Sequence, residues 1–502
     1  MNLLLDKWIP VIEKQILKRI SLQDVLCGKC DDDVTITLSR DDMEFAALQL
    51  IISICQSIFL PENENELKQR IDNPISEAEY QKFITPYKEW FDLFHNKYPF
   101  MQAIEVHTVK KEPISISIQN ILPGLPAETS HVFFNSAKEV EKICPSCTAI
   151  ALFNQAANAP SFGGGFKYGL RNVPITAFIQ GDNLRATIWN NILPKDFGNL
   201  PQAQDNNEPV WVKPITDSKI DPSQIGLLRG LFWQPAKIKL SDKIVMDKKN
   251  TCMLCGIETD TMVASFIRKQ FNFEVEGYWN HPHSSKIITL KKKKEKPESV
   301  ISAMPFNNSN PTWTYLPGLL YQVEINAESR EPAATIRHYY DNNDKAYKLM
   351  VGGYVNKQAK IKNRRHDTRP ISISPIWKSK SENPFSSLGD TLKEVKQFVE
   401  KLKSVCIIKC GENKINLKKR AIELFYQRTE SDIYNIIKNV HLKKKDEEKR
   451  ELFKEISKIT KKIFQEVTFT YRHKPEYLVE ILNNEHKLNK NIGKLLKEEN
   501  PK

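Results

Sequence analysis

Residues 144–171 read CPSCTAIALFNQAANAPSFGGGFKYGLR, and this stretch sets how the N-terminal part of the chain folds. It combines a Cys-x-x-Cys pair, a short helix and a three-glycine loop. Glycine has no Cβ, so residues 163–165 can adopt positive φ angles and let a ligand approach the backbone closely. Lys167 and Arg171 follow the loop and would supply positive charge to an anionic ligand. We therefore expect this stretch to carry function.

The cysteines of the chain predict a zinc site. Three Cys-x-x-Cys pairs are present, namely Cys27/Cys30, Cys144/Cys147 and Cys252/Cys255. Two pairs together supply the four thiolates of a closed tetrahedral site, in which zinc is structural because no position is left for water. The second and third pairs lie in tight CPSC and CMLCG segments, whereas the first lies in a polar loop. The pattern leaves open which two pairs combine, and a redox role is the alternative for any one pair.

The composition is that of an ordinary globular protein with a basic balance. The chain has 502 residues, of which 40% are hydrophobic and 27% charged, so two or more domains with a sizeable core are expected. The formal net charge of +13 favours an acidic partner such as nucleic acid. A basic protein without such a partner is the alternative.

The sequence shows no pattern typical of a signal peptide or a membrane span. Asp6 and Lys7 stand where a signal peptide needs apolar residues. The longest apolar stretch, at residues 48–60, is interrupted by polar side chains and is too short to cross a bilayer. We therefore expect a cytoplasmic protein with no membrane partner, in which the cysteines stay reduced.

The hydrophobic pattern predicts a mixed N-terminal part. Residues 41–60 carry apolar side chains at helical spacing and predict a core helix that Ser39 or Asp41 caps. From about residue 184 to 290, short β-rich runs such as ATIW and KIITL alternate with Pro, Asn and Gly. Residues 286–304 predict two strands joined by a lysine-rich hairpin.

The pattern becomes helical after the loop WKSKSENPFSSLGD at residues 377–390. Apolar stripes at helical spacing and short connections favour an antiparallel bundle of about four helices. We therefore expect a mixed α/β domain at residues 1–378, a linker at 379–390 and an all-α bundle at 391–502.

A second candidate binding segment, VGGYVNKQAKIKNRRHD, occupies residues 351–367. Its two glycines predict a turn that projects Asn356, Lys357 and Gln358. Such side chains can read hydrogen-bond acceptors in the minor groove of DNA or wedge apart a base step. A solvated basic loop is the alternative.

The motifs give little support to enzymatic chemistry. The glycine loop lacks the third glycine of the dinucleotide fingerprint, and no Gly-Lys-Ser or Gly-Lys-Thr follows it. His366-Asp367 resembles one part of a metal phosphohydrolase site, but no second His/Asp cluster accompanies it in the sequence. A metal-dependent nuclease or phosphodiesterase that uses His366 and Asp367 is therefore the alternative hypothesis. His281-Pro282-His283 predicts a loop turn.

Several long segments resemble the CasA family, the large subunits of type I-E CRISPR Cascade surveillance complexes. The resemblance runs nearly end to end. It rests on MNLLLDKWIPV, SRDDMEFAALQL, YPFMQ, CTAIALFNQAANAPSFGGGFKYGLR, RGLFWQPAKIKL, NHPHS and GGYVNKQAKIKNRRHD. It implies a mixed α/β N-terminal domain with a structural zinc site, followed by a C-terminal four-helix bundle.

The resemblance further implies a DNA-sensing subunit that is not an enzyme. Such a subunit recognises the protospacer-adjacent motif in the minor groove of target double-stranded DNA, while a guide RNA reads the longer sequence. It starts the strand separation that forms the R-loop. The implied partners are the target DNA, the 5′ handle of the guide RNA, the other Cascade subunits and a separate helicase-nuclease.

Individual residues acquire roles by the same resemblance. The glycine loop that lies against the minor groove consists of Ser161, Phe162, Gly163 and Gly164. The segment that sends a basic side chain into this groove includes Arg268, Lys269 and Gln270. The wedge loop, in which Gln358 inserts beneath the motif, consists of Asn356, Lys357, Gln358 and Ala359. Contacts to the guide RNA and to neighbouring subunits come from Phe133 and Asn135. The implied zinc ligands are Cys144, Cys147, Cys252 and Cys255, which leaves Cys27 and Cys30 as incidental thiols.

Three positions depart from the family pattern. Ser161 stands in place of a glycine, Lys357 in place of an asparagine, and Gln270 in place of the minor-groove lysine. Lys269 or Arg268 would compensate for Gln270. Because the minor groove distinguishes mainly A·T from G·C pairs, we expect tolerance of several motifs.

Overall fold

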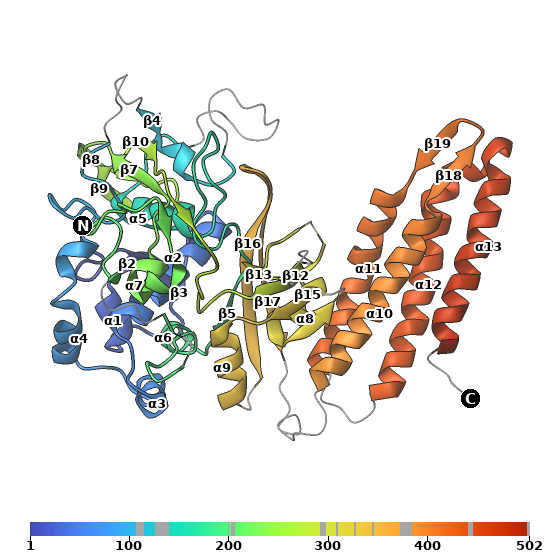
Figure 1. Ribbon diagram of the computed structural model, residues 1–502, viewed down its shortest axis with the longest axis horizontal. Coiled ribbons are helices and arrows are strands. Elements are labelled where there is room, and N and C mark those ends of the chain that lie inside the picture. Colours follow the sequence, from blue (N-terminus) through green and yellow to red (C-terminus); the bar gives the residue numbers. More distant parts are fainter. Residues whose placement is uncertain are drawn as a thin grey trace. The chain divides into compact units, whose positions relative to one another are not determined.

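In the computed structural model, the almost entirely buried helix α2 (Asp41–Ile58) lies within the main hydrophobic core (Figure 1). Helices α5 (Pro145–Ala157) and α7 (Leu227–Leu231) pack against it. The predicted cap of α2 at Ser39 or Asp41 is wrong, since the N-cap residue is Arg40 and its side chain caps no amide. The Arg40 guanidinium forms an ion pair with Asp42 instead, with Nη2 2.7 Å from Oδ2.

The structure describes residues 1–106, 115–125, 140–198, 200–201, 206–291, 298–307, 310–325, 328–343, 346–371, 384–439 and 445–498. The chain separates into two compact units. Unit 1 consists of Met1–Ser309, Glu324–Asn343 and Lys348–Arg369, and unit 2 consists of Asn310–Val323, Asp344–Tyr347 and Pro370–Lys502.

Small sheets frame the core of unit 1. One has the order β2-β1-β3, with β1 (Ile9–Glu13), β2 (Ile16–Ile20) and β3 (Thr35–Ile36). A second has the order β4-β10-β7, with β4 (Ile116–Ser117), β7 (Ala236–Leu240) and β10 (Ser265–Gln270). A third has the order β17-β16-β5, with β5 (Thr176–Gln180), β16 (Tyr347–Lys357) and β17 (Lys360–Ile371).

The remaining strands of this part form one antiparallel hairpin, one parallel pair and one four-stranded sheet. The two-stranded pairs are β8 (Ile244–Thr251) with β9 (Glu258–Met262), and β6 (Lys219–Ile220) with β11 (Glu274–Val275). The larger sheet has the order β13-β12-β15-β14, with β12 (Lys286–Lys291), β13 (Glu298–Ala303), β14 (Val323–Ile325) and β15 (Glu328–Glu331). The predicted strands within 286–304 are confirmed as β12 and β13, and the lysine-rich connection at 292–297 lies outside the described residues.

Short helices complete unit 1. They are α1 (Leu22–Leu26), α3 (Glu64–Asp72), α4 (Glu77–Ile84), α6 (Leu184–Trp189) and α9 (Ala334–Asn342). The prediction of a β-rich run at ATIW is wrong, because these residues end α6. The Asn183 side chain begins this helix by accepting a hydrogen bond from the Ala186 amide, which is a typical N-cap interaction.

Unit 2 is dominated by long helices. They are α10 (Pro384–Val405), α11 (Lys418–Asn439), α12 (Lys445–Arg472) and α13 (Pro475–Glu498), with the short α8 (Leu316–Leu320) and the hairpin of β18 (Ile407–Cys410) and β19 (Asn413–Asn416). Helix α10 contacts the other three long helices, and α12 contacts both α11 and α13. Helix α10 begins at Pro384, within the predicted linker at 379–390, because proline suits the first turn of a helix.

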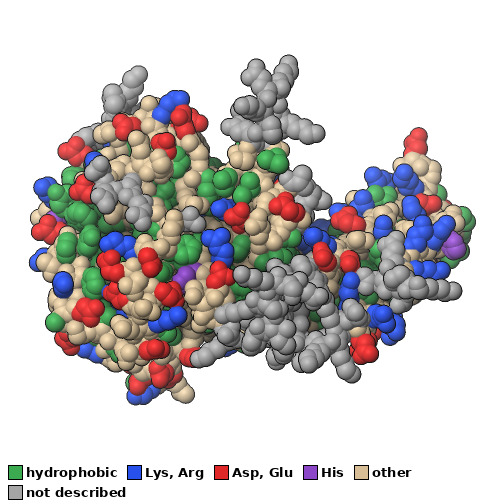
Figure 2. All heavy atoms as spheres, turned by 60° about the horizontal axis from the view of Figure 1, so that its bottom comes forward, with side chains coloured by type: hydrophobic (Ala, Val, Ile, Leu, Met, Phe, Trp, Pro, Cys, Tyr) green, Lys and Arg blue, Asp and Glu red, His purple; other side chains and the backbone are tan. Residues whose placement is uncertain are grey.

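The mixed α/β class predicted from the sequence is confirmed by these elements. On the face that Figure 2 shows, basic and acidic side chains are interspersed. Within the described ranges, no helix combines the length and the apolar character needed to cross a membrane.

Candidate nucleic-acid interface and zinc site

Four cysteine side chains from two segments meet in unit 1. The Sγ atoms of Cys144, Cys147, Cys252 and Cys255 all lie within 4.8 Å of one another, and all four residues are buried. The Sγ atoms of Cys144 and Cys255 are 3.8 Å apart, and so are those of Cys147 and Cys252. Four sulfurs at about 2.3 Å from a tetrahedral zinc ion lie about 3.8 Å from one another. The donor set therefore fits a structural zinc ion.

Local backbone structure positions each cysteine pair. Cys144 is the N-cap residue of α5, and its Sγ accepts a hydrogen bond from the Cys147 amide at 3.5 Å. Cys252 lies in the turn between β8 and β9. The two segments meet because Ile143 and Val263 form an antiparallel bridge, and the Cys144 amide lies 3.4 Å from the Cys252 Sγ atom. The pairing that the sequence pattern left open is thus set by contacts distant in sequence.

The contacts among the four sulfurs lower the pKa of the Cys252 and Cys255 thiols and raise the pKa of the Cys144 and Cys147 thiols. Arg19 Nη2 lies 3.5 Å from the Cys255 Sγ atom. Burial by itself lowers the pKa of Arg19, but the sulfurs of Cys144 and Cys255 outweigh burial, so the pKa of Arg19 is raised. Hydrogen bonds from Cys144 and Cys147 lower the pKa of the Cys255 thiol to about 7. Zinc binds the thiolate form of cysteine, and the charge of a bound zinc ion would also deprotonate Cys144 and Cys147.

Helix α5 leads directly into the glycine loop, and Arg171 closes the loop at its base. The guanidinium donates to the Ala157 carbonyl at 3.0 Å and to Asn158 Oδ1 at 2.9 Å. Arg171 is only 3% exposed, and burial lowers its pKa to about 9. The prediction that Arg171 offers charge to an anionic ligand is therefore wrong, whereas Lys167 is exposed.

The three glycines of the loop all have positive φ angles, of 78°, 57° and 91° at Gly163, Gly164 and Gly165. A Cβ atom on Gly163 would lie 3.5 Å from the Ala359 Cβ atom, and one on Gly165 would lie 2.8 Å from Gln270 Oε1. A Cβ atom on Gly164 would have no neighbour within 4 Å among the described atoms. The loop thus contacts two other predicted DNA-binding segments and is open at Gly164.

Strand β10 supplies one of these segments. The Arg268 guanidinium lies 4.2 Å from the ring centroid of Phe162 and 5.1 Å from that of Phe166, and burial lowers its pKa. Successive side chains of a strand point to opposite faces, so Arg268 and Gln270 share the face toward the glycine loop and Lys269 lies on the other. Gln270 is therefore the exposed side chain of β10 beside the loop.

The hairpin of β16 and β17 supplies the other segment. Gln358 and Ala359 form the two-residue turn between these strands. Gln358 is exposed and has a φ of 55°, a conformation that costs a residue with a Cβ about 1 kcal/mol. The Asn356 side chain donates a hydrogen bond of 2.6 Å to the Gln358 carbonyl and stabilises the turn. The turn presents Gln358 to solvent.

The predicted turn at Gly352 and Gly353 is wrong, because both glycines lie inside β16. A Cβ atom on Gly352 would lie 2.6 Å from His366 Cδ2 and 2.8 Å from the Phe45 ring, and one on Gly353 would lie 2.6 Å from the Pro174 carbonyl oxygen. These glycines therefore allow neighbouring groups to pack closely against the strand.

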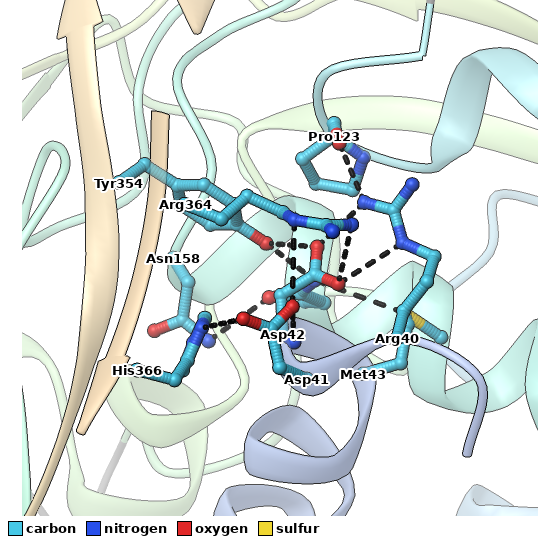
Figure 3. Close-up of polar contacts among 10 residues, drawn as sticks. Arg40, Asp41, Asp42, Met43, Pro123, Asn158, Tyr354, Arg364 and His366 are labelled. Carbon is cyan, nitrogen blue, oxygen red and sulfur yellow. Dashed lines mark hydrogen bonds and ion pairs between the residues drawn. The ribbon is translucent and has the colours of Figure 1, made fainter. Parts of the chain in front are cut away.

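A buried polar network joins the hairpin to α2 (Figure 3). The Tyr354 hydroxyl donates to Asp42 Oδ2 at 2.8 Å and accepts from Asn154 Nδ2 at 2.8 Å. Arg40 binds the same carboxylate through two nitrogens, at 3.0 and 2.7 Å. Arg364 Nη1 lies 3.5 Å from Asp42 Oδ1. One carboxylate of α2 is thus linked to β16 and β17 directly and to α5 through Tyr354.

His366 and Asp367, the residues of the nuclease hypothesis, lie on β17. His366 Nδ1 lies 3.1 Å from Asp41 Oδ2 (Figure 3), and this hydrogen bond, aided by the charge of Arg364, lowers the pKa of Asp41 to about 2. Asp367 accepts a hydrogen bond of 2.8 Å from Arg369. In the part of the chain that the structure describes, only the cysteine cluster brings three or more His, Cys, Asp or Glu ligand atoms close enough for a metal ion.

The other predicted residues do not join these sites. Phe133 and Asn135 lie outside the described residues. Cys27 and Cys30 are half-buried near the end of α1 and do not belong to the cysteine cluster. Residues 281–283 form a turn, as predicted, but the turn is buried, and His283 Nε2 donates to the Asn191 carbonyl at 3.0 Å.

Sequence reasoning did not find the Asp42 network. One signal for it is present, since Asn154 interrupts the apolar run of α5 and a polar side chain on a buried helix needs a partner. The second missed feature is the contact of Arg268 with two phenylalanine rings. Phe162 and Phe166 flank the glycines in the sequence, but nothing local indicates that they meet a strand about a hundred residues later.

The fold and the site define a two-unit, mixed α/β protein in which a four-cysteine site supports a glycine loop beside a β-hairpin. A family model described as CRISPR-associated protein Cse1 matches residues 2–465. The chain therefore belongs to this family, and the resemblance found in the sequence is confirmed.

Solved structures are similar to this chain over nearly its whole length. Cse1 of Thermobifida fusca is 17% identical with a TM-score of 0.73, over 100% of this chain and 99% of that one. CasA of Thermus thermophilus is 16% identical with a TM-score of 0.71, over 98% and 99%. A chain of a CRISPR RNA-guided surveillance complex is 14% identical with a TM-score of 0.67, over 97% and 99%. At these identities the similarity establishes the fold.

Proposed function

We propose that this chain is the large, non-catalytic subunit of a type I-E CRISPR Cascade complex. In this role it recognises the protospacer-adjacent motif in the minor groove of target duplex DNA and starts strand separation for R-loop formation. Membership of the Cse1 family supports the proposal, as does the similarity to a chain of an RNA-guided surveillance complex. The proposed location is the cytoplasm.

The observation that carries the proposal is the meeting of three segments distant in sequence. The glycine loop contacts the hairpin turn at Ala359 on one side and the end of β10 at Gln270 on the other. Gly164 is open, so a DNA backbone can approach it closely. Gln270 offers both a donor and an acceptor to base edges in the minor groove. Gln358 stands exposed at the turn, where a side chain can enter a base step.

Other parts of the chain take supporting roles in this proposal. Zinc on the four cysteines would hold the start of α5 and would take no part in catalysis, because thiolates fill its coordination positions. Helices α10–α13 would form an antiparallel four-helix bundle that contacts other Cascade subunits and the helicase-nuclease. Phe133 and Asn135 would contact the 5′ handle of the guide RNA.

The wedge role is tested with Gln358→Ala in the assembled complex with guide RNA. We expect strand opening, followed by a fluorescent base analogue beside the motif, to slow about tenfold, because unstacking a base step costs a few kcal/mol. Binding of the closed duplex should change by less than about twofold, because phosphate contacts supply most of that affinity. The matched control is Gln15→Ala, which replaces another exposed glutamine at positive φ in a two-residue hairpin turn.

Equal losses of duplex binding and strand opening in Gln358→Ala would remove the wedge role. The nuclease alternative is tested by incubating the isolated chain with duplex DNA in magnesium or manganese. Cleavage that His366→Ala abolishes would replace the proposal with an enzymatic one.

A further inference from the structure

A cavity of about 550 Å³ lies in unit 1 at the root of the β16–β17 hairpin. Its walls come from α2, the segment around β3, the turn between β5 and α6, and strands β16 and β17. Ligand pockets of small organic molecules usually have volumes of about 300–1,000 Å³. The cavity is therefore large enough for such a molecule.

The cavity has an acidic lining, although the whole chain carries a net charge of +13. Its carboxylates are those of Asp32, Asp33, Asp41, Glu44, Asp182 and Asp367. The described residues that line it include no lysine or arginine. A concave, acidic surface of this kind focuses negative potential and attracts cations.

Neighbouring basic groups compensate only part of this charge. Asp41 pairs with His366 and with Arg364, whose Nε atom is 3.4 Å from its Oδ1 atom. Asp367 pairs with Arg369 at 2.8 Å. Asp32 accepts a hydrogen bond from the Asn183 side chain and also interacts with the charge of Arg185. Glu44 has a neutral partner, since it accepts a hydrogen bond from the Leu38 amide. The cavity thus keeps an excess of negative charge.

The spacing of the carboxylates determines which cation fits. Within the described part of the chain, no three of these oxygens come close enough together to hold one metal ion. Between the carboxylates lie apolar side chains, among them Phe45, Leu48 and Met350. Dispersed negative charges with apolar surface between them complement a chain molecule that has several separated cationic groups and methylene segments.

We propose that this cavity binds an aliphatic polyamine, with ammonium groups on the carboxylates and methylene segments against the apolar side chains. The proposal is independent of DNA recognition. The walls of the cavity include α2, β16 and β17, and the buried carboxylate of Asp42 links these same three elements. A bound polyamine would therefore stabilise the root of the hairpin that carries Gln358.

The test is calorimetric titration of the full-length chain with spermidine, at constant ionic strength and without nucleic acid. We expect saturable binding with one site, and putrescine should bind more weakly because it carries fewer charges. The double variant Asp33→Asn/Asp182→Asn removes two exposed carboxylates of the rim and should weaken spermidine binding about tenfold. The matched control is Asp247→Asn/Asp260→Asn, which makes the same charge change in the β8–β9 hairpin and should leave binding unchanged.

Three outcomes would overturn the proposal. One is spermidine binding that falls equally in both double variants, which would reflect overall charge alone. Another is the absence of saturable binding to a chain whose thermal unfolding shows it to be folded. The third is displacement of spermidine by magnesium at equal concentration, which would assign the cavity to a compact divalent ion.

Discussion

Replacing Tyr354 by phenylalanine tests whether the buried network holds the β16–β17 hairpin to helix α2. The substitution removes one oxygen atom and keeps the aromatic ring, which is 1% exposed. The lost hydroxyl donates to Asp42 Oδ2 and accepts from Asn154 Nδ2, each at 2.8 Å. The change therefore removes two buried hydrogen bonds with little loss of apolar contact.

The size of the effect follows from these two partners. A hydrogen bond to a charged group contributes about 1.5–3 kcal/mol, and a buried donor left without its partner costs about 1–3 kcal/mol. Both former partners of the hydroxyl keep other contacts. Arg40 and Arg364 still bind Asp42, and Asn154 Nδ2 keeps a contact of 3.8 Å with the Met43 sulfur. The total loss is therefore smaller than the sum of the two upper values. We expect the free energy of unfolding of unit 1 to fall by about 3 kcal/mol.

Tyr278→Phe is the matched control, since it deletes the same atom from another buried hydroxyl of unit 1. The Tyr278 hydroxyl has no hydrogen-bond partner among the described residues, so its removal relieves an unsatisfied polar group and should not destabilise the protein. Urea denaturation followed by tryptophan fluorescence measures both variants. A lower midpoint for Tyr354→Phe alone is the expected result, and equal midpoints would refute the role of the network.

Two further predictions concern the zinc site and acid stability. Cys252→Ser should lower both the zinc content, measured by elemental analysis, and the midpoint of thermal unfolding, because metal binding is coupled to folding. The control Cys27→Ser should change neither quantity. An unchanged zinc content in Cys252→Ser would contradict the four-cysteine assignment. Burial lowers the pKa of His283 from 6.5 to about 3, so the unfolded state takes up this proton first as the pH falls. Stability should therefore decline below about pH 6.5, by up to about 1.4 kcal/mol per pH unit for this group, and urea midpoints that are equal at pH 7 and pH 5 would argue against it.

The elements that could be predicted from the sequence are those that local chemistry determines. Residues 286–304 alternate as strands do around a lysine-rich connection, and the structure forms two strands there. The β-branched residues of ATIW favour a strand locally, but the Asn183 side chain caps this segment and it forms the end of α6. Tertiary packing also converts Gly352 and Gly353 from apparent turn residues into strand residues against Phe45 and Pro174.

The candidate site could be predicted in its parts but not in its arrangement. Cys144 and Cys147 stand at the start of α5, and Cys252 and Cys255 in the β8–β9 turn, yet their pairing depends on the bridge between Ile143 and Val263. The local sequence does not show whether an arginine that follows a glycine loop is exposed to solvent or buried in the core. Arg171 lies in the core because the ends of the loop present a carbonyl and an amide oxygen to it, and no local pattern shows that.

The glycine loop is supported at both of its ends, so its three consecutive glycines need no side chains of their own to position it. Zinc on the four cysteines would fix the first turn of α5, where Cys144 and Cys147 stand. At the other end of α5, Arg171 joins the Ala157 carbonyl to the segment that follows the loop. Because both supports lie outside the loop, Gly164 has no neighbour that would block it among the described residues, as the proposed approach of a DNA backbone requires.

The β16–β17 hairpin, which carries the proposed wedge, shares this support, because Asn154 of α5 donates to Tyr354 of β16. One helix thus connects the cysteine cluster, the glycine loop and the hairpin that presents Gln358. Loss of zinc should therefore disturb the base of the β16–β17 hairpin as well as the glycine loop. It should weaken the proposed motif-dependent strand opening, although the cysteines themselves lie in a buried cluster.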